Sequence, residues 1–218
     1  MDLSHLQFKS PFTCMVCGPT SSGKTVLTRA IIKDFQILMQ VNDPIYKVMW
    51  CYGIWQPFYN VPIAYNVEVN YVSGLPSEEE IDSNMPHLIV LDDLMNELGG
   101  NPKLADLFTK GSHHKNISVL FITQNMFHKG SQMRNVALNC HYYIIMKNPR
   151  DKAQIEHFSR QAFPGKSKYF LEAYDDATKE PHGYLKVDLT QSTPDQYRVQ
   201  TRIATEQPYF SPIIYMPK

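Results

Sequence analysis

Residues 18–25 read GPTSSGKT, and the pattern G-x-x-x-x-G-K-T is typical of a loop that binds phosphate groups. The glycines allow a tight turn whose backbone N–H groups point inward, and a helix that begins at Lys24 would add the positive end of its dipole. The Lys24 ammonium can then reach the β- and γ-phosphates of ATP, and the Thr25 hydroxyl can hold Mg²⁺. The predicted nucleotide-binding residues are Gly18, Pro19, Thr20, Ser21, Ser22, Gly23, Lys24 and Thr25.

The segments on either side of this loop have the character that the motif requires. Residues 12–17 form an apolar run of strand length, and residues 26–32 are rich in helix formers and apolar residues. The order strand, glycine loop, helix distinguishes a nucleotide site from a glycine-rich structural turn, which is the alternative interpretation. The flanking segments therefore favour a nucleotide site.

Asp92 and Asp93 follow a run of four large apolar residues, 88–91, that shows no alternation. Such a run predicts a strand buried on both faces, as in a parallel sheet, and the C-terminal end of such a strand is where α/β proteins place their chemistry. We expect Asp92 to bind Mg²⁺ through a water molecule and Asp93 to polarise the water that attacks the γ-phosphate. The alternative is that the two acids cap a helix, which their place after a phosphate loop argues against.

Gln124 ends another apolar segment, residues 117–123. An amide at the C-terminal tip of a strand can donate a hydrogen bond to the γ-phosphate or to the attacking water. A turn residue that caps the next segment is an equally good interpretation of Gln124 from its local sequence alone.

The charges of the chain are balanced overall but unevenly spread. The 218 residues are enough for one sizeable core and include 21 basic and 21 acidic residues. Eleven Lys or Arg residues and three acids lie between Lys103 and Lys168, and such a basic half is expected of a protein that binds a polyanion. A basic solvated surface is the alternative. The sequence has no secretion signal and no apolar run of membrane-spanning length, so we expect a soluble, intracellular protein with no membrane partner.

Cys14 and Cys17 have the C-x-x-C spacing of some metal and redox sites, but they lie inside the first expected strand. Side chains three residues apart in a strand point to opposite faces of the sheet. We therefore expect small core residues rather than a shared metal or a disulfide.

The hydrophobic patterns predict strands and helices in alternation, followed by two strands that alternate apolar and polar residues at an antiparallel edge. We expect strands at 12–17, 47–52, 67–72, 87–93, 117–123, 141–146, 183–189 and 196–203, and helices at 24–39, 102–112, 130–139, 151–162 and 167–178, with a short helix after Ser77 and one helical turn within 54–66. These elements predict one α/β domain over residues 1–206. The tail, residues 207–218, contains three prolines, so we expect it to form no regular element and either to fold back on the core or to dock on another protein.

With these elements placed, the sequence resembles the FtsK–HerA clade of P-loop ATPases. It is most similar to the genome-packaging ATPases of polinton (Maverick) elements, adintovirus-like viruses and virophages, and more distantly to those of poxviruses. The resemblance covers residues 12 to about 203 and rests on GPTSSGKT at 18–25, LIVLDDLM at 88–95, LFTKGSHHKNISVLFITQNMF at 107–127, LNCHYYIIMKNPRDKAQI at 138–155 and GYLKVDL at 183–189. It implies a three-layer P-loop NTPase sandwich (RecA/ASCE-like) with a mainly parallel central sheet and antiparallel C-terminal edge strands.

The resemblance also implies roles for particular residues. The strand that ends in Gln124 would lie between the phosphate-loop strand and the strand that ends in Asp92, so that Gln124 is the sensor beside the γ-phosphate. The clade assembles as rings, usually hexamers, in which an arginine reaches the nucleotide of the neighbouring subunit. Arg134 is our first candidate for this arginine and Arg150 the second, and both have a surface charge or a DNA contact as the alternative. Lys115 stands where related sequences often carry Arg.

The implied activity is an ATP-driven motor that moves double-stranded DNA into a capsid. Because a motor must run over any sequence, its DNA contacts should be to phosphate groups, and Lys110, Lys115, His128 and Lys129 are the candidates. A capsid protein would be a further partner, and the host-cell nucleus, a viral factory and the virion are the expected locations.

Two other classes of protein fit the phosphate loop. A small P-loop kinase or nucleotide-metabolising enzyme would need an arginine-rich lid, and no compact segment of this kind occurs in the sequence. A nucleotide-gated assembly protein would bind ATP with negligible turnover, but all the catalytic positions are filled.

Overall fold

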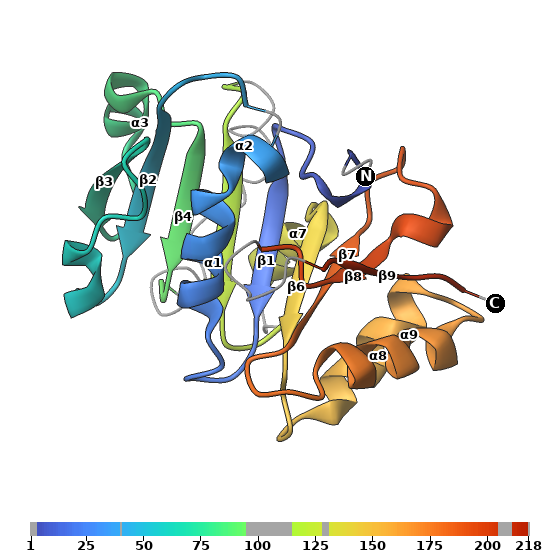
Figure 1. Ribbon diagram of the computed structural model, residues 1–218. Coiled ribbons are helices and arrows are strands. Elements are labelled where there is room, and N and C mark those ends of the chain that lie inside the picture. Colours follow the sequence, from blue (N-terminus) through green and yellow to red (C-terminus); the bar gives the residue numbers. More distant parts are fainter. Residues whose placement is uncertain (1–3, 40, 95–114, 128–130, 205–210, 218) are drawn as a thin grey trace.

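The computed structural model describes residues 4–39, 41–94, 115–127, 131–204 and 211–217. Within them one nine-stranded sheet has the order β3-β2-β4-β5-β1-β6-β7-β8-β9 (Figure 1). Neighbouring strands from β3 to β6 are parallel, and β6 to β9 pair antiparallel. The strands are β1 Thr13–Cys17, β2 Tyr46–Tyr52, β3 Val67–Ser73, β4 Leu88–Asp92, β5 Ser118–Thr123, β6 Tyr142–Met146, β7 Tyr184–Asp188, β8 Val199–Thr201 and β9 Ile213–Tyr215.

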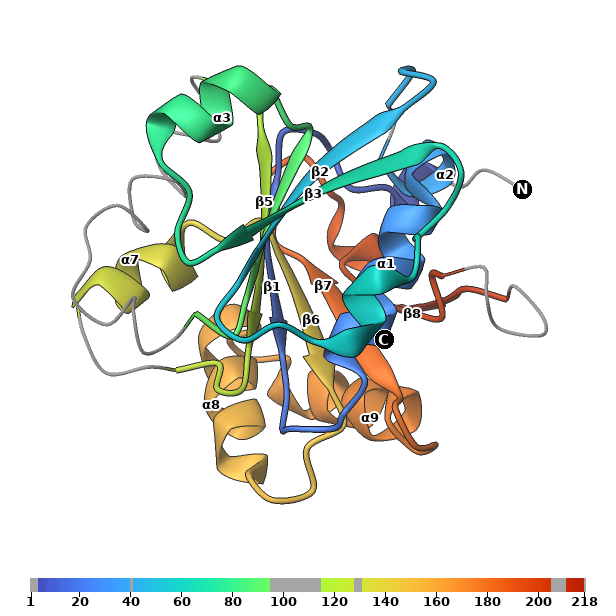
Figure 2. The same cartoon turned by 90° about the vertical axis from the view of Figure 1, so that its left-hand side faces the viewer.

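Helices cover both faces of this sheet, which makes a three-layer structure (Figure 2). One face carries α1 and α2, and the other carries α3, α7, α8 and α9. The α-helices are α1 Lys24–Lys33, α2 Phe35–Leu38, α3 Glu78–Asn84, α7 Ser131–Leu138, α8 Lys152–Ala162 and α9 Ser167–Ala177, and the 3-10 helices are η1 Ser4–Leu6, η2 Pro57–Asn60 and η4 Asp195–Tyr197.

The hydrophobic core has two parts, one on each face of the sheet. Along β1, Met15 and Cys17 belong to one part, whereas Cys14 and Val16 belong to the other. This alternation confirms that Cys14 and Cys17 point to opposite faces. Both thiols are buried and free, and burial raises their pKa values above those of an ordinary cysteine.

The mainly parallel sheet with antiparallel C-terminal strands confirms the predicted fold class, but the first helix is not continuous. The expected helix over 24–39 is interrupted at Asp34, which has φ −90° and ψ 21°. The N–H groups of Ile37 and Leu38 both bond to Asp34 O at 2.9 Å, so a new short helix begins there. Phe35, the first residue of this short helix, is buried and stacks on Tyr46 at a ring separation of 4.7 Å. The expected helix at 102–112 lies outside the described residues.

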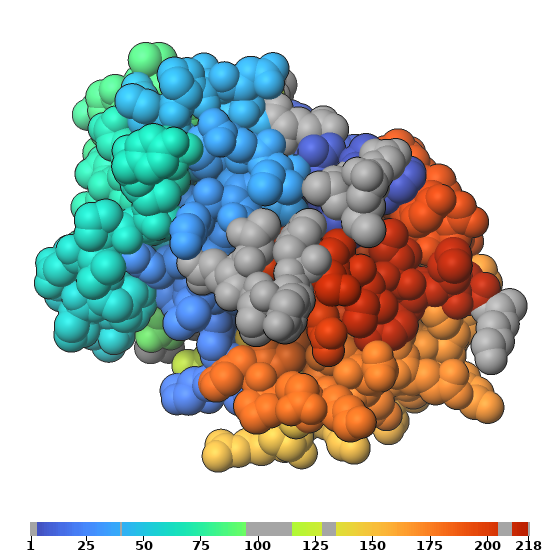
Figure 3. Space-filling model, in the orientation of Figure 1, coloured from blue at the N-terminus to red at the C-terminus, as the bar shows by residue number. Residues whose placement is uncertain are grey.

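The expectation that the tail forms no regular element is wrong, because its residues Ile213–Tyr215 form β9 at the end of the sheet. Pro212 and Pro217 lie outside this strand, so its three residues keep the N–H groups that pairing requires. The Tyr215 hydroxyl donates to Asp176 on α9 at 2.6 Å, and Tyr169 donates to Tyr215 O at 2.6 Å. The described part of the tail, residues 211–217, therefore folds back on its own core, where Figure 3 shows its dark-red atoms beside α9.

A buried lysine holds the N-terminal segment against the sheet. Lys186 of β7 is fully buried, and its ammonium donates to Leu6 O at 2.6 Å and to Gln200 Oε1 at 3.1 Å. The ammonium also lies 4.4 Å from the centre of the Phe8 ring and 5.2 Å from that of Tyr142, which are favourable cation–π distances. Burial lowers the pKa of Lys186 to about 8.

We expect this lysine to make stability depend on pH in a predictable direction. In the unfolded chain a lysine titrates near its ordinary pKa of about 10.4, so between about pH 8 and pH 10 the unfolded state binds more protons than the folded state. The contribution of Lys186 to the free energy of unfolding should therefore rise by about 2–3 kcal/mol across this window. Urea unfolding at several pH values measures the free energy of unfolding of the wild type and of Lys186→Met. The wild-type value minus the variant value should grow as the pH rises. Lys168→Met, at an exposed position on α9, should give a difference that stays flat.

Candidate active site

The phosphate loop joins the end of β1 to the start of α1 and is fastened to the neighbouring strand. The Gly18 N–H donates to Thr123 O at the end of β5 at 3.2 Å. Gly23, with φ 94°, takes the left-handed conformation that the turn into α1 requires and offers no side chain to cap the helix. The first N–H groups of α1 therefore remain available for an anion. Ser22 Oγ is buried and has no hydrogen-bond partner within the described part of the chain.

The Lys24 ammonium lies within the curve of this loop. It donates to Gly18 O at 2.9 Å and to Pro19 O at 2.8 Å. Burial lowers the pKa of Lys24, and the nearby charges of Asp92 and Asp93 oppose that shift. Within the described residues this half-buried ammonium has two carbonyl partners and no carboxylate partner at hydrogen-bond distance, so it suits a bound phosphate.

The two acids differ in exposure and therefore in chemistry. Asp92 ends β4, is only 8% exposed and accepts a hydrogen bond from the Tyr59 hydroxyl at 3.0 Å between Oδ2 and the phenol oxygen. Burial raises the pKa of Asp92, and the Tyr59 hydrogen bond lowers it. Asp93 is exposed and has φ 55°, an uncommon conformation for a non-glycine residue. Asp92 is therefore held in place, whereas Asp93 faces solvent.

Gly53, at the end of β2, supports the backbone that carries these acids. Its N–H donates to Asp92 O at 3.1 Å, and a methyl group added to Gly53 would lie 2.6 Å from Asp93 O. The obstructing atom belongs to the backbone, so it cannot rotate out of the way. Only glycine allows β2 to approach the turn at Asp93 this closely.

We expect Gly53→Ala to displace Asp93 and to destabilise the protein by about 1–3 kcal/mol, the usual cost of an overpacked site. The free energy of unfolding and the rate of ATP hydrolysis should both fall. Gly165→Ala is the matched control, because Gly165 has φ 77° and open space around its α-carbon. That variant should lose stability through backbone strain but keep its hydrolysis rate, and hydrolysis by Gly53→Ala at the wild-type rate would contradict the prediction.

Eight of the predicted site residues line one cavity of about 470 Å³: Thr20, Ser21, Gly23, Lys24, Thr25, Asp92, Asp93 and Gln124. They meet because β1, β5 and β4 are adjacent and parallel, with Cys17 opposite Thr123 and Asp92 opposite Ile122 in the register. The three strands end at the same edge of the sheet, as expected of an α/β ligand site. The hydroxyl of Thr25 and the carboxylate of Asp92 are hard oxygen ligands, which suit Mg²⁺.

Eight further residues that were not predicted as site residues line the same cavity: Val26, Ile54, Gln56, Phe58, Tyr59, Ile122, Thr123 and His182. His182, in the turn between α9 and β7, has its Nδ1 atom 3.2 Å from Ser22 O. A carbonyl oxygen only accepts hydrogen bonds, so this ring nitrogen carries the proton. The contact joins residues 160 positions apart, and no local pattern could have revealed it.

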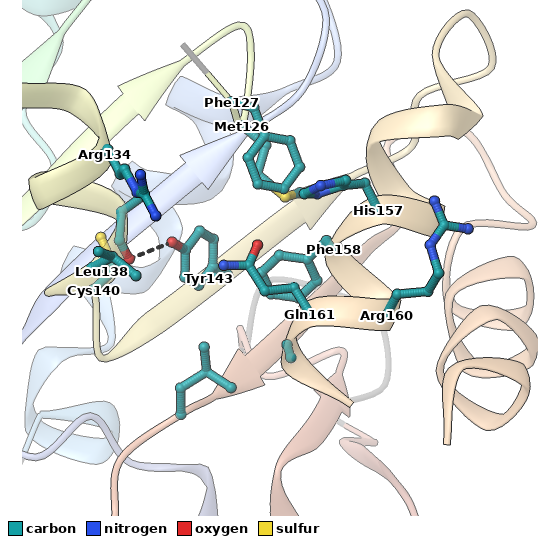
Figure 4. A pocket seen from close by; sticks show the side chains of 13 residues that line it. Met126, Phe127, Arg134, Leu138, Cys140, Tyr143, His157, Phe158, Arg160 and Gln161 are labelled. Carbon is teal, nitrogen blue, oxygen red and sulfur yellow. Dashed lines mark hydrogen bonds between the residues drawn. The ribbon is translucent and has the colours of Figure 1, made fainter. Parts of the chain in front are cut away.

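The two arginine candidates lie away from this cavity. Arg134, on α7, lines a different cavity of about 890 Å³ between α7 and α8, whose floor includes Tyr143 and Phe158 (Figure 4). Arg150 is exposed just before α8, where its N–H donates to Asn148 Oδ1 at 3.1 Å. Neither arginine lines the phosphate cavity of its own chain.

The candidate DNA contacts are described only in part. Lys110, His128 and Lys129 lie outside the described residues. Lys115 is exposed before β5 and forms an ion pair with Asp82 of α3. Within the described ranges, no helix combines the length and the apolar character needed to cross a membrane.

Comparison with known proteins gives structural matches only, since no protein-family model and no curated protein matches the sequence. The genome packaging NTPase B204 from Sulfolobus turreted icosahedral virus 2 in complex with ATP-gammaS aligns with a TM-score of 0.57 at 10% identity, over 87% of this chain and 94% of that chain. Its complex with sulfate aligns with a TM-score of 0.56 at 10% identity, over 82% and 91%. B204, the DNA-packaging ATPase from Sulfolobus turreted icosahedral virus, gives 0.54 at 11% identity, over 84% and 94%.

At such low identity these structures are similar to the chain in fold. They confirm the predicted P-loop NTPase fold, and they are structures of a viral packaging NTPase, in agreement with the resemblance found in the sequence.

Proposed function

We propose that this chain is an ATP-hydrolysing motor of the FtsK–HerA clade that moves double-stranded DNA and packages a viral or virus-like genome. The observation that most supports the proposal is that a single cavity beside the phosphate loop is lined by Lys24, Thr25, Asp92, Asp93 and Gln124. These are the residue types that ATP hydrolysis requires, namely a cation for the phosphates, an oxygen pair for Mg²⁺, a base and a polar sensor.

In the proposed reaction each residue has one task. The phosphate-loop N–H groups and Lys24 bind the β- and γ-phosphates, which replace the carbonyl partners that Lys24 has in this structure. Thr25 and Asp92 hold Mg²⁺, which neutralises charge on the phosphates when bound. Asp93 polarises the attacking water and accepts its proton, and Gln124 orients that water or the γ-phosphate.

We propose further that the motor is a ring, most simply a hexamer, with Arg134 or Arg150 reaching the nucleotide of the next subunit. Two apolar side chains beside the phosphate cavity support an assembly that covers them, because Val26 is 70% exposed and Ile54 is 67% exposed. A ring also reconciles a neutral chain with a polyanion partner, since several copies of a basic segment would line the central pore.

The test is ATP turnover by the purified protein with and without duplex DNA. We expect turnover that duplex DNA stimulates irrespective of its sequence, and DNA binding that weakens steeply as salt is raised. Single-particle images with an ATP analogue and duplex DNA should show rings around the DNA. Absence of ATP turnover would contradict the proposed enzymatic activity. Turnover by a monomeric protein at a rate that DNA does not change would contradict the proposed motor and favour a nucleotide-metabolising enzyme.

A further inference from the structure

Tyr59 connects the acidic end of β4 to a cluster of aromatic rings. Its side chain is buried, at 4% exposure, and its hydroxyl donates to Asp92 Oδ2 at 3.0 Å. Five aromatic rings lie around that of Tyr59, at centroid distances of 4.6 Å for Phe58, 5.0 Å for Tyr71, 5.3 Å for Trp55, 5.7 Å for Tyr52 and 5.8 Å for Trp50. The phenol is therefore fixed by packing and is not free to rotate away from the carboxylate.

The segment that contains Tyr59 is also bonded to α1, the helix that follows the phosphate loop. Arg29, on α1, donates to Val61 O at 2.6 Å and to Pro62 O at 3.2 Å. Its guanidinium also lies 5.8 Å from the centre of the Phe58 ring. The helix that begins with Lys24 and the segment that presents Tyr59 are thus joined by direct contacts.

The hydrogen bond fixes the direction in which the Asp92 carboxylate offers its oxygen atoms. The Tyr59 hydroxyl occupies one lone pair of Oδ2 and fixes the plane of the carboxylate, which leaves the remaining lone pairs to other partners. Carboxylate oxygens are ligands that suit Mg²⁺, and this cation demands near-ideal ligand geometry.

We propose that Tyr59 is a positioning residue, which holds the Asp92 carboxylate in a fixed orientation for the Mg²⁺ that accompanies the bound nucleotide. This inference rests on the proposed function, and it assigns to the segment between β2 and β3 the support of the metal site. Outer partners of metal-binding carboxylates commonly change metal affinity by about 10–100-fold when they are removed.

Calorimetric titration of Mg²⁺ into protein saturated with the ATP analogue AMPPCP tests the inference. We expect Tyr59→Phe to weaken Mg²⁺ binding by about 10–100-fold, with analogue binding in EDTA unchanged. Tyr52→Phe is the matched control, because it removes a hydroxyl from a ring of the same cluster without touching the bond to Asp92. Both tryptophans of the chain, Trp50 and Trp55, adjoin Tyr59, so their fluorescence provides a second measure of the Mg²⁺ midpoint.

A double-mutant cycle separates positioning from general packing. If Tyr59 acts through Asp92, the effect of Tyr59→Phe on Mg²⁺ affinity should largely vanish in the Asp92→Asn background. An unchanged Mg²⁺ midpoint, an equal loss in Tyr52→Phe, or a loss of metal-free analogue binding in Tyr59→Phe would each overturn the inference and leave the proposed function standing. Failure of the wild-type protein to bind the analogue at all would overturn both.

Discussion

Replacement of Asp93 by Asn is expected to lower the rate of ATP hydrolysis by about 10²–10⁴-fold, the usual contribution of a general base. The asparagine side chain has the same shape but cannot accept a proton from the attacking water. Asp93 is exposed to the cavity and is not the residue that Tyr59 holds, so its replacement should leave the fold and nucleotide binding intact. Steady-state turnover, combined with titration of a non-hydrolysable analogue, distinguishes a loss of chemistry from a loss of binding.

The control for this variant is Asp175→Asn, at an exposed position on α9 that does not line the phosphate cavity. It makes the same change of charge and should hydrolyse ATP at the wild-type rate. Wild-type turnover by Asp93→Asn would show that Asp93 is not the base, and Asp92 would then have to be tested in its place.

Replacement of Lys24 by Ala should weaken nucleotide binding and lower kcat by about 10²–10³-fold, as for loss of a donor that stabilises developing charge. The ammonium lies in the curve of the loop, and no second lysine or arginine lines the described part of this cavity. The protein without nucleotide should remain folded, because the partners of Lys24 among the described residues are carbonyl groups of its own loop. Analogue affinity and single-turnover hydrolysis measure the two effects separately.

Lys168→Ala removes the same charge from an exposed position on α9 and should leave analogue affinity and turnover unchanged. If Lys24→Ala binds the analogue as tightly as the wild type does, Lys24 does not bind the phosphate groups as proposed. The cavity would then need a different ligand.

The parts of the site that are local in sequence could be predicted from it. The phosphate loop and the buried strand before Asp92 are each encoded within eight or fewer residues, and both lie where the patterns indicate. The position of Gln124 between them depends on the order of β4, β5 and β1, which spacing alone does not determine. Resemblance to the packaging ATPases supplied that order, and the structure agrees with it.

The contacts that Tyr59 and His182 make in the candidate active site could not be predicted from the sequence, because each residue contacts a partner that is distant along the chain. Tyr59 is 33 residues from Asp92, and its segment, residues 54–66, has no hydrophobic period. His182 reaches the loop from an irregular turn. β9 was missed for the opposite reason: the prolines around it are usually read as strand breakers, but a strand of three residues fits between them.

The contact between His182 and Ser22 O has a mechanical consequence. It attaches the phosphate loop to the turn that leads into β7, and β7 is paired on both sides, with β6 and with β8. When a nucleotide departs and the loop relaxes, either this single 3.2 Å bond breaks or the turn travels with the loop. In the second case the movement passes into β7 and from there into the two strands that pair with it, β6 and β8.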